Sequence, residues 1–396
     1  MVKSFLIGKV MFNKYLNTLC LLMALLTPAV LFSQTDSIKW DQKSYIKFLH
    51  TEFFIPDLKQ SLSDQLFHHR YNVKYYPNPN WTLRMEVRSR LFYGELVKST
   101  PDFAGTIDNA NNDYFDLSWV VASSKSIVLH TMIDRLSAAY SKGPWDIRIG
   151  RQRINWGIHT FWNANDIFNA FSFTDFDYEE RPGSDAVLAR YYFNGNSSIE
   201  VAAKAAHHVR LGTYASLWRF NRWNYDFQVL GGYFQNNMVA GFGWAGNLGT
   251  AGWKGEWSYF QDLADGGTNV FTGATGIDYS FAKGTYVQAG FMINSQGETQ
   301  APVTELFNFS LSAKNLYPYR SAIYLQASHP ISPLVNGGLS IIYSPVKSQP
   351  FFVNPTISVS VAENWDLDLV GQVLWNKTDH FYSPLQAFFL RMKFSY

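Results

Sequence analysis

Residues 81–91 read WTLRMEVRSRL, in which apolar residues alternate with polar and charged residues at every position except Ser89. Because successive side chains of a β-strand point to opposite faces, this stretch predicts a strand with one apolar face and one charged face. The charged face carries Arg84, Glu86, Arg88 and Arg90. Strands of this kind also occur in soluble sheets, so the fold class depends on whether the pattern recurs.

The alternation recurs along most of the chain. Residues 145–149 (WDIRI), 253–259 and 365–375 repeat it, and residues 388–396 repeat it up to the terminal Tyr396. Alternating segments of about ten residues, separated by turn residues, are typical of a transmembrane β-barrel. Since an open sheet edge would leave unpaired amides in hydrocarbon, the sheet must close. We therefore expect an all-β fold, a single antiparallel transmembrane barrel of about 18 strands, with about 16 as the second choice.

Composition agrees with this fold class. Aromatic residues make up 17% of the chain, far more than a soluble protein usually carries, and aromatic girdles at the two membrane interfaces would explain the excess. After the N-terminal segment there is no run of 18 apolar residues, which excludes membrane-spanning helices.

The N-terminal segment, residues 1–33, has the features of a secretory signal. Three lysines precede an apolar stretch at 19–30, and cleavage is expected near Ser33/Gln34, with either Met1 or Met11 as the start. The sole cysteine, Cys20, lies within this segment, so the mature chain should contain no disulfide. For residues 34–60 a periplasmic plug, an extra strand and a tail remain open, and residues 61–396 are predicted to form the barrel.

Removal of the signal leaves 30 basic and 31 acidic residues, so the net charge of the mature chain gives no argument for polyanion binding. No nucleic-acid partner is predicted.

Residues 145–190 depart from simple alternation at Gly150. Charges occupy even positions before it and odd positions after it, at Arg151 and Arg153. A charge facing lipid at the midplane costs about 2–4 kcal/mol. We therefore predict a β-bulge at Gly150 that keeps both arginines facing the lumen.

The 29 residues from 155 to 183 form a long connection for a barrel. We expect it to fold into the lumen and to place carboxylates opposite the arginines of the wall, which would create a charged constriction. The alternative is that these charges only pair and fasten the loop. The predicted pore-lining residues are Arg84, Glu86, Arg88, Arg90, Asp146, Arg148, Arg151, Arg153, Asp175, Asp177, Glu179, Glu180 and Arg190.

A divalent-cation site is a third interpretation of this loop. Asp175, Asp177 and Glu179 have a spacing that places three carboxylates on one strand face, and oxygen ligands suit calcium. The glycine-containing loop of a dedicated calcium site is missing, and the adjacent histidine pairs point to opposite strand faces. We therefore predict no metal site and no cofactor.

Three short motifs carry a resemblance to a known family: GRQRINWG at 150–157, WNANDIFN at 162–169 and ERPGSD at 180–185. Together they resemble the central block of outer-membrane porins in Bacteroidetes-type bacteria. They are more distantly similar to alginate-export and phosphate-selective porin barrels, in which an R-Q-x-x-x-W-G block opens a long loop. The matching block covers about 36 residues, and the rest of the chain matches only in pattern. The motif residues are Gly150, Gln152, Trp156, Gly157, Asp166, Arg181, Pro182, Gly183 and Asp185.

The resemblance implies an outer-membrane channel in a Gram-negative bacterium, and it does not transfer a substrate. The interleaved acids, such as Glu200, Glu256 and Asp368, depart from the densely basic pore of alginate exporters. We expect passive diffusion of small hydrophilic solutes, including charged ones, and no enzymatic activity. The alternatives are a plugged barrel that acts in export, adhesion or envelope assembly, and, more weakly, a barrel enzyme. Expected partners are outer-membrane lipid, lipopolysaccharide, the barrel assembly machinery and the solutes; self-association is left open.

Overall fold

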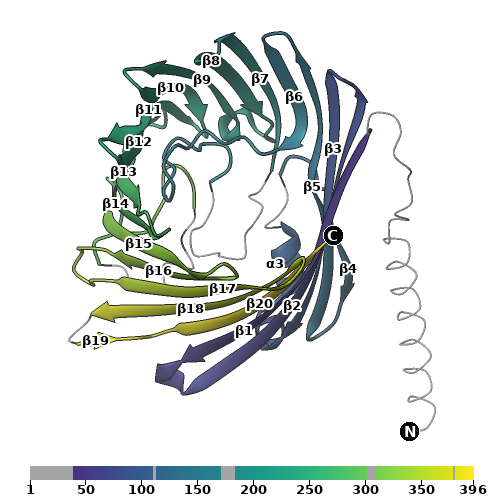
Figure 1. Ribbon diagram of the computed structural model, residues 1–396, viewed down its shortest axis with the longest axis vertical. Coiled ribbons are helices and arrows are strands. Elements are labelled where there is room, and N and C mark those ends of the chain that lie inside the picture. Colours follow the sequence, from purple (N-terminus) through teal and green to yellow (C-terminus); the bar gives the residue numbers. More distant parts are fainter. Residues whose placement is uncertain (1–38, 110–112, 171–182, 301–308, 310, 378–379) are drawn as a thin grey trace. The chain divides into compact units, whose positions relative to one another are not determined.

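The last strand of the chain pairs with the first, and this pairing closes the sheet. In the computed structural model, β20 (Gln386–Ser395) runs antiparallel to β1 (Trp40–Ile55), with Phe48 opposite Met392. The structure describes residues 39–109, 113–170, 183–300, 309, 311–377 and 380–396. Within this part of the chain, 18 antiparallel strands form a closed barrel (Figure 1), as the sequence predicted. Closure leaves no open edge in the ring, which is the condition for a sheet in hydrocarbon.

The other strands of the ring, in chain order, are β2 (Gln60–Asn78), β3 (Trp81–Gly94), β5 (Ile127–Lys142), β6 (Trp145–Gln152), β7 (Ser184–Asn194), β8 (Ser197–Lys204), β9 (Thr213–Arg222), β10 (Tyr225–Phe234), β11 (Asn237–Leu248), β12 (Ala251–Asp262), β13 (Val270–Ser280), β14 (Tyr286–Asn294), β15 (Ser321–Ser332), β16 (Val335–Tyr343), β17 (Phe351–Ala362) and β18 (Trp365–Lys377).

Two short strands lie outside the ring. The strand β4 (Ser118–Ser123) pairs with the beginning of β5, while β3 pairs with β5 directly on the other side. The strand β19 (Phe381–Tyr382) pairs antiparallel with the last two residues of β18. The strands β4 and β5 form a hairpin, but β4 is not one of the 18. Residues 40–55, part of the segment for which three interpretations were open, form the ring strand β1.

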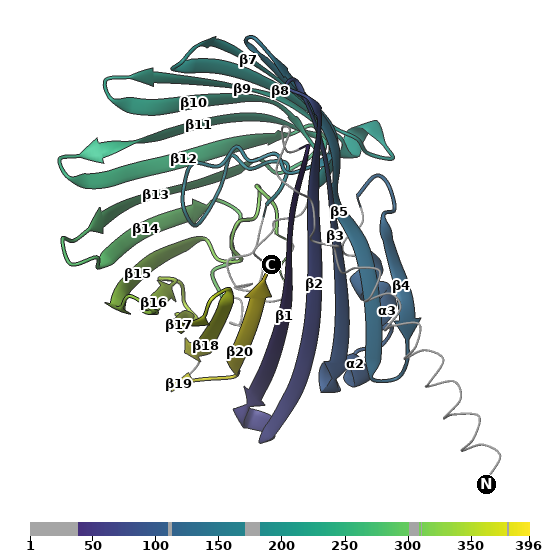
Figure 2. The same cartoon turned by 45° about the vertical axis from the view of Figure 1, so that its right-hand side comes forward.

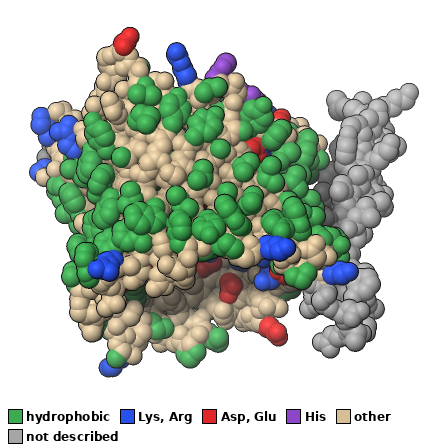
Figure 3. All heavy atoms as spheres, turned by 90° about the horizontal axis from the view of Figure 1, so that it is seen from above, with side chains coloured by type: hydrophobic (Ala, Val, Ile, Leu, Met, Phe, Trp, Pro, Cys, Tyr) green, Lys and Arg blue, Asp and Glu red, His purple; other side chains and the backbone are tan. Residues whose placement is uncertain are grey.

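The two faces of the wall differ as the alternation requires. On β3, Leu83 and Met85 are exposed on the outside, whereas Glu86 and Arg88 are buried on the inside. Figure 3 shows one outer face, on which hydrophobic side chains form a broad band. No helix in the described residues is long and apolar enough to cross a membrane.

Connections at one end of the barrel are short, and several at the other end are long. Helices α2 (Glu95–Ser99) and α3 (Phe103–Asn109) follow β3, and single turns of 3-10 helix, η1 (Pro56–Leu58) and η2 (Val209–Leu211), follow β1 and β8. The chain after β6 and the chain before β15 turn inside the ring of strands (Figures 1 and 2). These inward segments bring loop residues against the inner wall.

Candidate functional site

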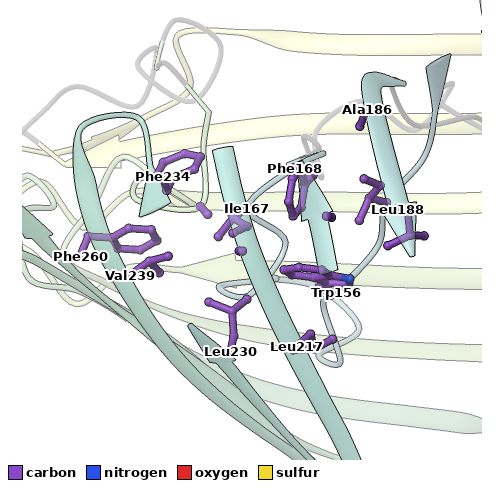
Figure 4. Close-up of a cluster of buried hydrophobic side chains, with 14 of the residues drawn as sticks. Trp156, Ile167, Phe168, Ala186, Leu188, Leu217, Leu230, Phe234, Val239 and Phe260 are labelled. Carbon is purple, nitrogen blue, oxygen red and sulfur yellow. The ribbon is translucent and has the colours of Figure 1, made fainter. Parts of the chain in front are cut away.

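The inward loop, defined as residues 153–170, packs an apolar face against the inner wall. Trp156 is fully buried, and Ile167 and Phe168 are nearly so. They join one cluster with wall residues that include Leu217 on β9 and Leu230 on β10 (Figure 4). The Trp156 and Phe168 rings meet edge to face at 4.8 Å between centroids. Burial of this many large side chains is the main force that holds the loop on the wall.

Glu200 on β8 anchors the first half of the loop. The indole Nε1 of Trp156 donates a hydrogen bond of 3.0 Å to Glu200 Oε2. The other oxygen, Oε1, pairs with Arg219 and lies 2.9 Å from Arg190 Nη2. The Gln228 side chain adds a further bond by donating to the Trp156 carbonyl at 2.6 Å. Thus the predicted pore-lining Arg190 supports the carboxylate that holds the loop.

Glu256 on β12 anchors the middle of the loop through backbone amides. Its Oε2 accepts hydrogen bonds from the backbone N–H groups of Ile158 and His159, the latter at 3.2 Å. Its Oε1 accepts from the Asn165 N–H at 3.1 Å. The carboxylate is almost completely buried. One side chain of the wall therefore satisfies three amides of the loop, which would otherwise lack partners away from water.

His159 stabilises the turn within the loop. Its Nδ1 accepts hydrogen bonds of 3.2 Å from the backbone N–H groups of Phe161 and Trp162. Burial, and then the nearby Lys254 ammonium, lowers the pKa of His159 to about 4. The imidazole is therefore neutral near pH 7, as an acceptor at Nδ1 requires.

A second inward segment, residues 311–320, lies beside the first. Tyr317 and Tyr319 are buried, and the Trp162 ring contacts Tyr317 at 5.8 Å between centroids. Phe161 stacks on Tyr324 of β15 at 3.8 Å. The two segments therefore fill the same side of the lumen.

The opposite side of the lumen is charged. Basic side chains lie on the inner faces of β1, β2, β3 and β5, together with the buried carboxylates of Glu86 and Asp134. Arg70 contacts both acids, and Arg88 Nη2 lies 3.0 Å from Asp134 Oδ1. We call these basic residues the basic arc: Lys47, Arg70, Arg84, Arg88, Arg90 and Arg135.

A polar cavity of about 240 Å³ lies between the inward segments and this charged wall. Arg88, Asp134, Arg151 and Lys204 line it, together with Ile167 and neighbouring residues of the inward loop. At this cavity the inward segments and the charged wall face each other across the lumen.

Arg151 lies at this cavity but is tightly paired. Its Nε and Nη2 bind the two carboxylate oxygens of Asp185 at 2.9 and 2.7 Å, and Nη2 also donates to the Phe115 carbonyl. Both Arg151 and Asp185 are almost completely buried. This fork-like geometry is the strong form of an arginine–carboxylate pair. Of its three nitrogens, only Nη1 lacks a hydrogen-bond partner among the described residues.

The prediction of a β-bulge at Gly150 is wrong. Both ladders of β6 run one to one through Gly150, which has a φ of +110°. The extra residue is instead Asp134 on the neighbouring strand β5, where the pairing with β3 shifts between Glu86 and Val87. The irregularity lies one strand away because Asp134 turns inward there to meet Arg70 and Arg88.

Other motif residues have structural contacts. The Gln152 amide donates to the carbonyls of Arg148 and Ala186. A side chain at Gly157 would meet Asn163, and one at Gly183 would meet Arg135 and Arg151. Asp166 is fully buried in the inward loop.

Of the other predicted site residues, some make few contacts and the rest lie outside the part of the chain that the structure describes. Asp146 and Arg148 are half-buried near the end of the barrel that has short turns, and Arg148 Nη2 lies 4.0 Å from Asp146 Oδ1. Arg153 is also half-buried. The residues outside the described part are Asp175, Asp177, Glu179, Glu180, Arg181 and Pro182.

Sequence reasoning missed Gln228 and the anchoring roles of Glu200 and Glu256. Strand alternation would have placed all three on the inner face. It could not have indicated their partners, because these include backbone groups of the loop.

The comparisons support the fold. No known family model and no curated protein sequence matches the chain. Solved structures of outer-membrane porins do match. Pseudomonas aeruginosa OpdQ shares 6% identity over 91% of this chain and 99% of its own, with a TM-score of 0.60. Acinetobacter baumannii OccAB2 shares 8% over 90% and 98%, with a TM-score of 0.57. Pseudomonas aeruginosa OccK7 (OpdD) shares 9% over 90% and 99%, with a TM-score of 0.54. At such identities the similarity establishes the fold.

Proposed function

We propose that this chain forms a porin-like channel in the outer membrane, through which small hydrophilic solutes diffuse passively. The observation that carries the proposal is the cross-section of the barrel. An apolar outer face surrounds a charged inner face, and the inward segments occupy one side of the lumen. A polar lumen narrowed from one side is suited to sorting solutes by size.

Liposome swelling tests this function directly. Vesicles that contain the refolded mature chain should swell in neutral sugars, and the rate should fall as the sugar becomes larger. Vesicles without protein provide the baseline. Folded barrels that admit no sugar would contradict the proposal and would favour a plugged barrel that acts in export, adhesion or envelope assembly.

The basic arc supports a charge preference. Arg84 and Arg90 are only partly buried, so their guanidinium groups can act on a passing ion. We propose that the arc favours anions and that the carboxylates at 175–180 oppose it. The sign of the reversal potential under a salt gradient would show which group of charges governs the pore.

Targeting and assembly follow from the same proposal. We propose that residues 1–33 direct export and are removed, and that the barrel is inserted by the outer-membrane assembly machinery. The C-terminal strand supports this route, because β20 alternates and ends next to the aromatic Tyr396. Lipid and lipopolysaccharide would then cover the outer face.

A further inference from the structure

We propose that Glu256 is a positioning residue that fixes the inward loop to the wall and thereby sets the width of the pore. The inference rests on the proposed channel function and assigns the width to one buried carboxylate. It would make the loop a fixed part of the wall, unlike a lid that opens and closes.

The first argument is the chemistry of the contact. An ionised carboxylate only accepts hydrogen bonds and has about four acceptor sites on its two oxygens. At Glu256 these sites receive the amides of Ile158, His159 and Asn165, which lie at both ends of an eight-residue turn of the loop. One carboxylate therefore clamps the turn at two points, and a neutral amide side chain could not reproduce this pattern.

The second argument is the shape of the wall around the clamp. The side-chain Nδ2 of Asn165 donates to the Phe242 carbonyl, and Ser258 Oγ donates to Asn165 Oδ1 at 2.8 Å. A Cβ atom at Gly241 would lie 2.5 Å from Asn165 Oδ1, and one at Gly276 would lie 2.8 Å from His159 Nε2. The absence of side chains at these two positions leaves the space that the loop occupies.

These features predict a loop that stays in place. The glycine positions admit the loop, the apolar cluster around Trp156 holds its first part, and Glu256 fixes the turn. Without the carboxylate, the turn would lose the partners of three amides while the apolar contacts remained. The loop should then fluctuate into the open part of the lumen.

The test compares Glu256→Gln with Asp368→Asn. Glutamine replaces one acceptor oxygen by an N–H donor, which would face a backbone donor. Asp368 is a matched control because it is also a buried wall carboxylate, and its hydrogen-bond partners among the described residues, Ser358 and Arg391, belong to the wall. Both proteins are refolded as full mature chains, and heat-modifiable gel mobility verifies that each barrel has folded.

Two measurements are made on each variant. In E256Q, the amides of residues 158, 159 and 165 should exchange with deuterium roughly tenfold faster, because at least one backbone amide loses its hydrogen-bond acceptor. The open-channel current should also become larger and noisier. D368N should match the unchanged chain in both measurements.

The exchange and conductance measurements test different parts of the proposal. Unchanged exchange at these amides in folded E256Q would overturn the clamp. Faster exchange with an unchanged current would overturn the claim that the clamp sets the pore width. If the unchanged chain conducts nothing, the channel function fails, while the exchange result still decides whether Glu256 holds the loop.

Discussion

The indole nitrogen of Trp156 donates a hydrogen bond of 3.0 Å to Glu200 Oε2, across a lumen-facing contact between the inward loop and β8. Replacing Trp156 with Phe keeps much of the apolar contact and removes this donor. Because hydrogen bonds to charged groups contribute about 1.5–3 kcal/mol, W156F should lower the free energy of unfolding by roughly that amount. Urea unfolding in lipid vesicles measures the difference. A W156F protein as stable as the parent would show that the bond does not hold the loop.

The buried charge network of the basic arc should be important for stability. Arg70 is fully buried and contacts both Glu86 and Asp134. Removal of one member of a buried ion network costs about 3–5 kcal/mol, because the remaining charges stay desolvated. We expect that loss for Arg70→Met in the same unfolding experiment.

Arg84→Gln provides the contrast for this experiment. Arg84 pairs with the same Glu86, but its side chain is 37% exposed. The expected loss is about 0–1 kcal/mol, as for exposed pairs. If the two substitutions cost the same, burial would not control the contribution of the arc.

Arg84 should nevertheless affect ion preference. The substitution Arg84→Gln removes a partly exposed positive charge on the inner face and should shift the reversal potential towards cation selectivity. Lys142→Gln removes the same charge from the exposed end of β5 and should change the reversal potential less. Equal shifts from both variants would place the selective charges outside the arc.

The loop should become less stable on the wall as pH falls. The pKa of His159 is lowered to about 4 in the folded chain, compared with about 6.5 when exposed. The unfolded chain therefore binds the proton first, and stability decreases as pH falls from about 6.5 to about 4, by roughly 3 kcal/mol at most.

His159→Asn isolates this contribution. Asparagine can present an oxygen acceptor to the amides of Phe161 and Trp162 but does not titrate in this range. Unfolding at pH 7 and pH 4 should show a smaller pH dependence for H159N than for the parent. The same dependence in both proteins would contradict a neutral, buried His159.

A leucine at Gly243 should displace the loop. A Cβ atom there would lie 2.9 Å from Ile158 Cδ1 and 3.2 Å from Asn165 Nδ2. We expect G243L to have a larger conductance, because the added side chain takes the space of the loop. Gly231 has nothing within 4 Å of its Cβ position and faces outward, so G231L is the control. A wider pore in both variants, or in neither, would mean that the loop does not narrow the lumen.

Much of the fold could be predicted from the sequence, because a barrel wall imposes a strict two-residue period. That period placed Arg84, Glu86 and Arg88 on the inner face, where Glu86 and Arg88 are buried. It could not locate the bulge. The pattern of β6 suggested an extra residue at Gly150, whereas the extra residue is Asp134 on β5, whose position is fixed by its pairing with arginines on β2 and β3.

The anchors of the loop were beyond sequence reasoning for a different reason. Glu200 and Glu256 have the spacing of ordinary inward strand residues. Their role depends on where an irregular loop presents its amides and its tryptophan, and the tertiary packing decides this. Likewise, β4 has a strand pattern, but β3 already pairs with β5 and leaves β4 outside the ring.

Single-channel recording in a planar bilayer, with the refolded mature chain, tests the central claim most directly. The account predicts discrete, steady openings, because the inward loop narrows the lumen and is fixed to the wall. A correctly folded barrel that gives no conductance across a range of voltages would contradict the channel function.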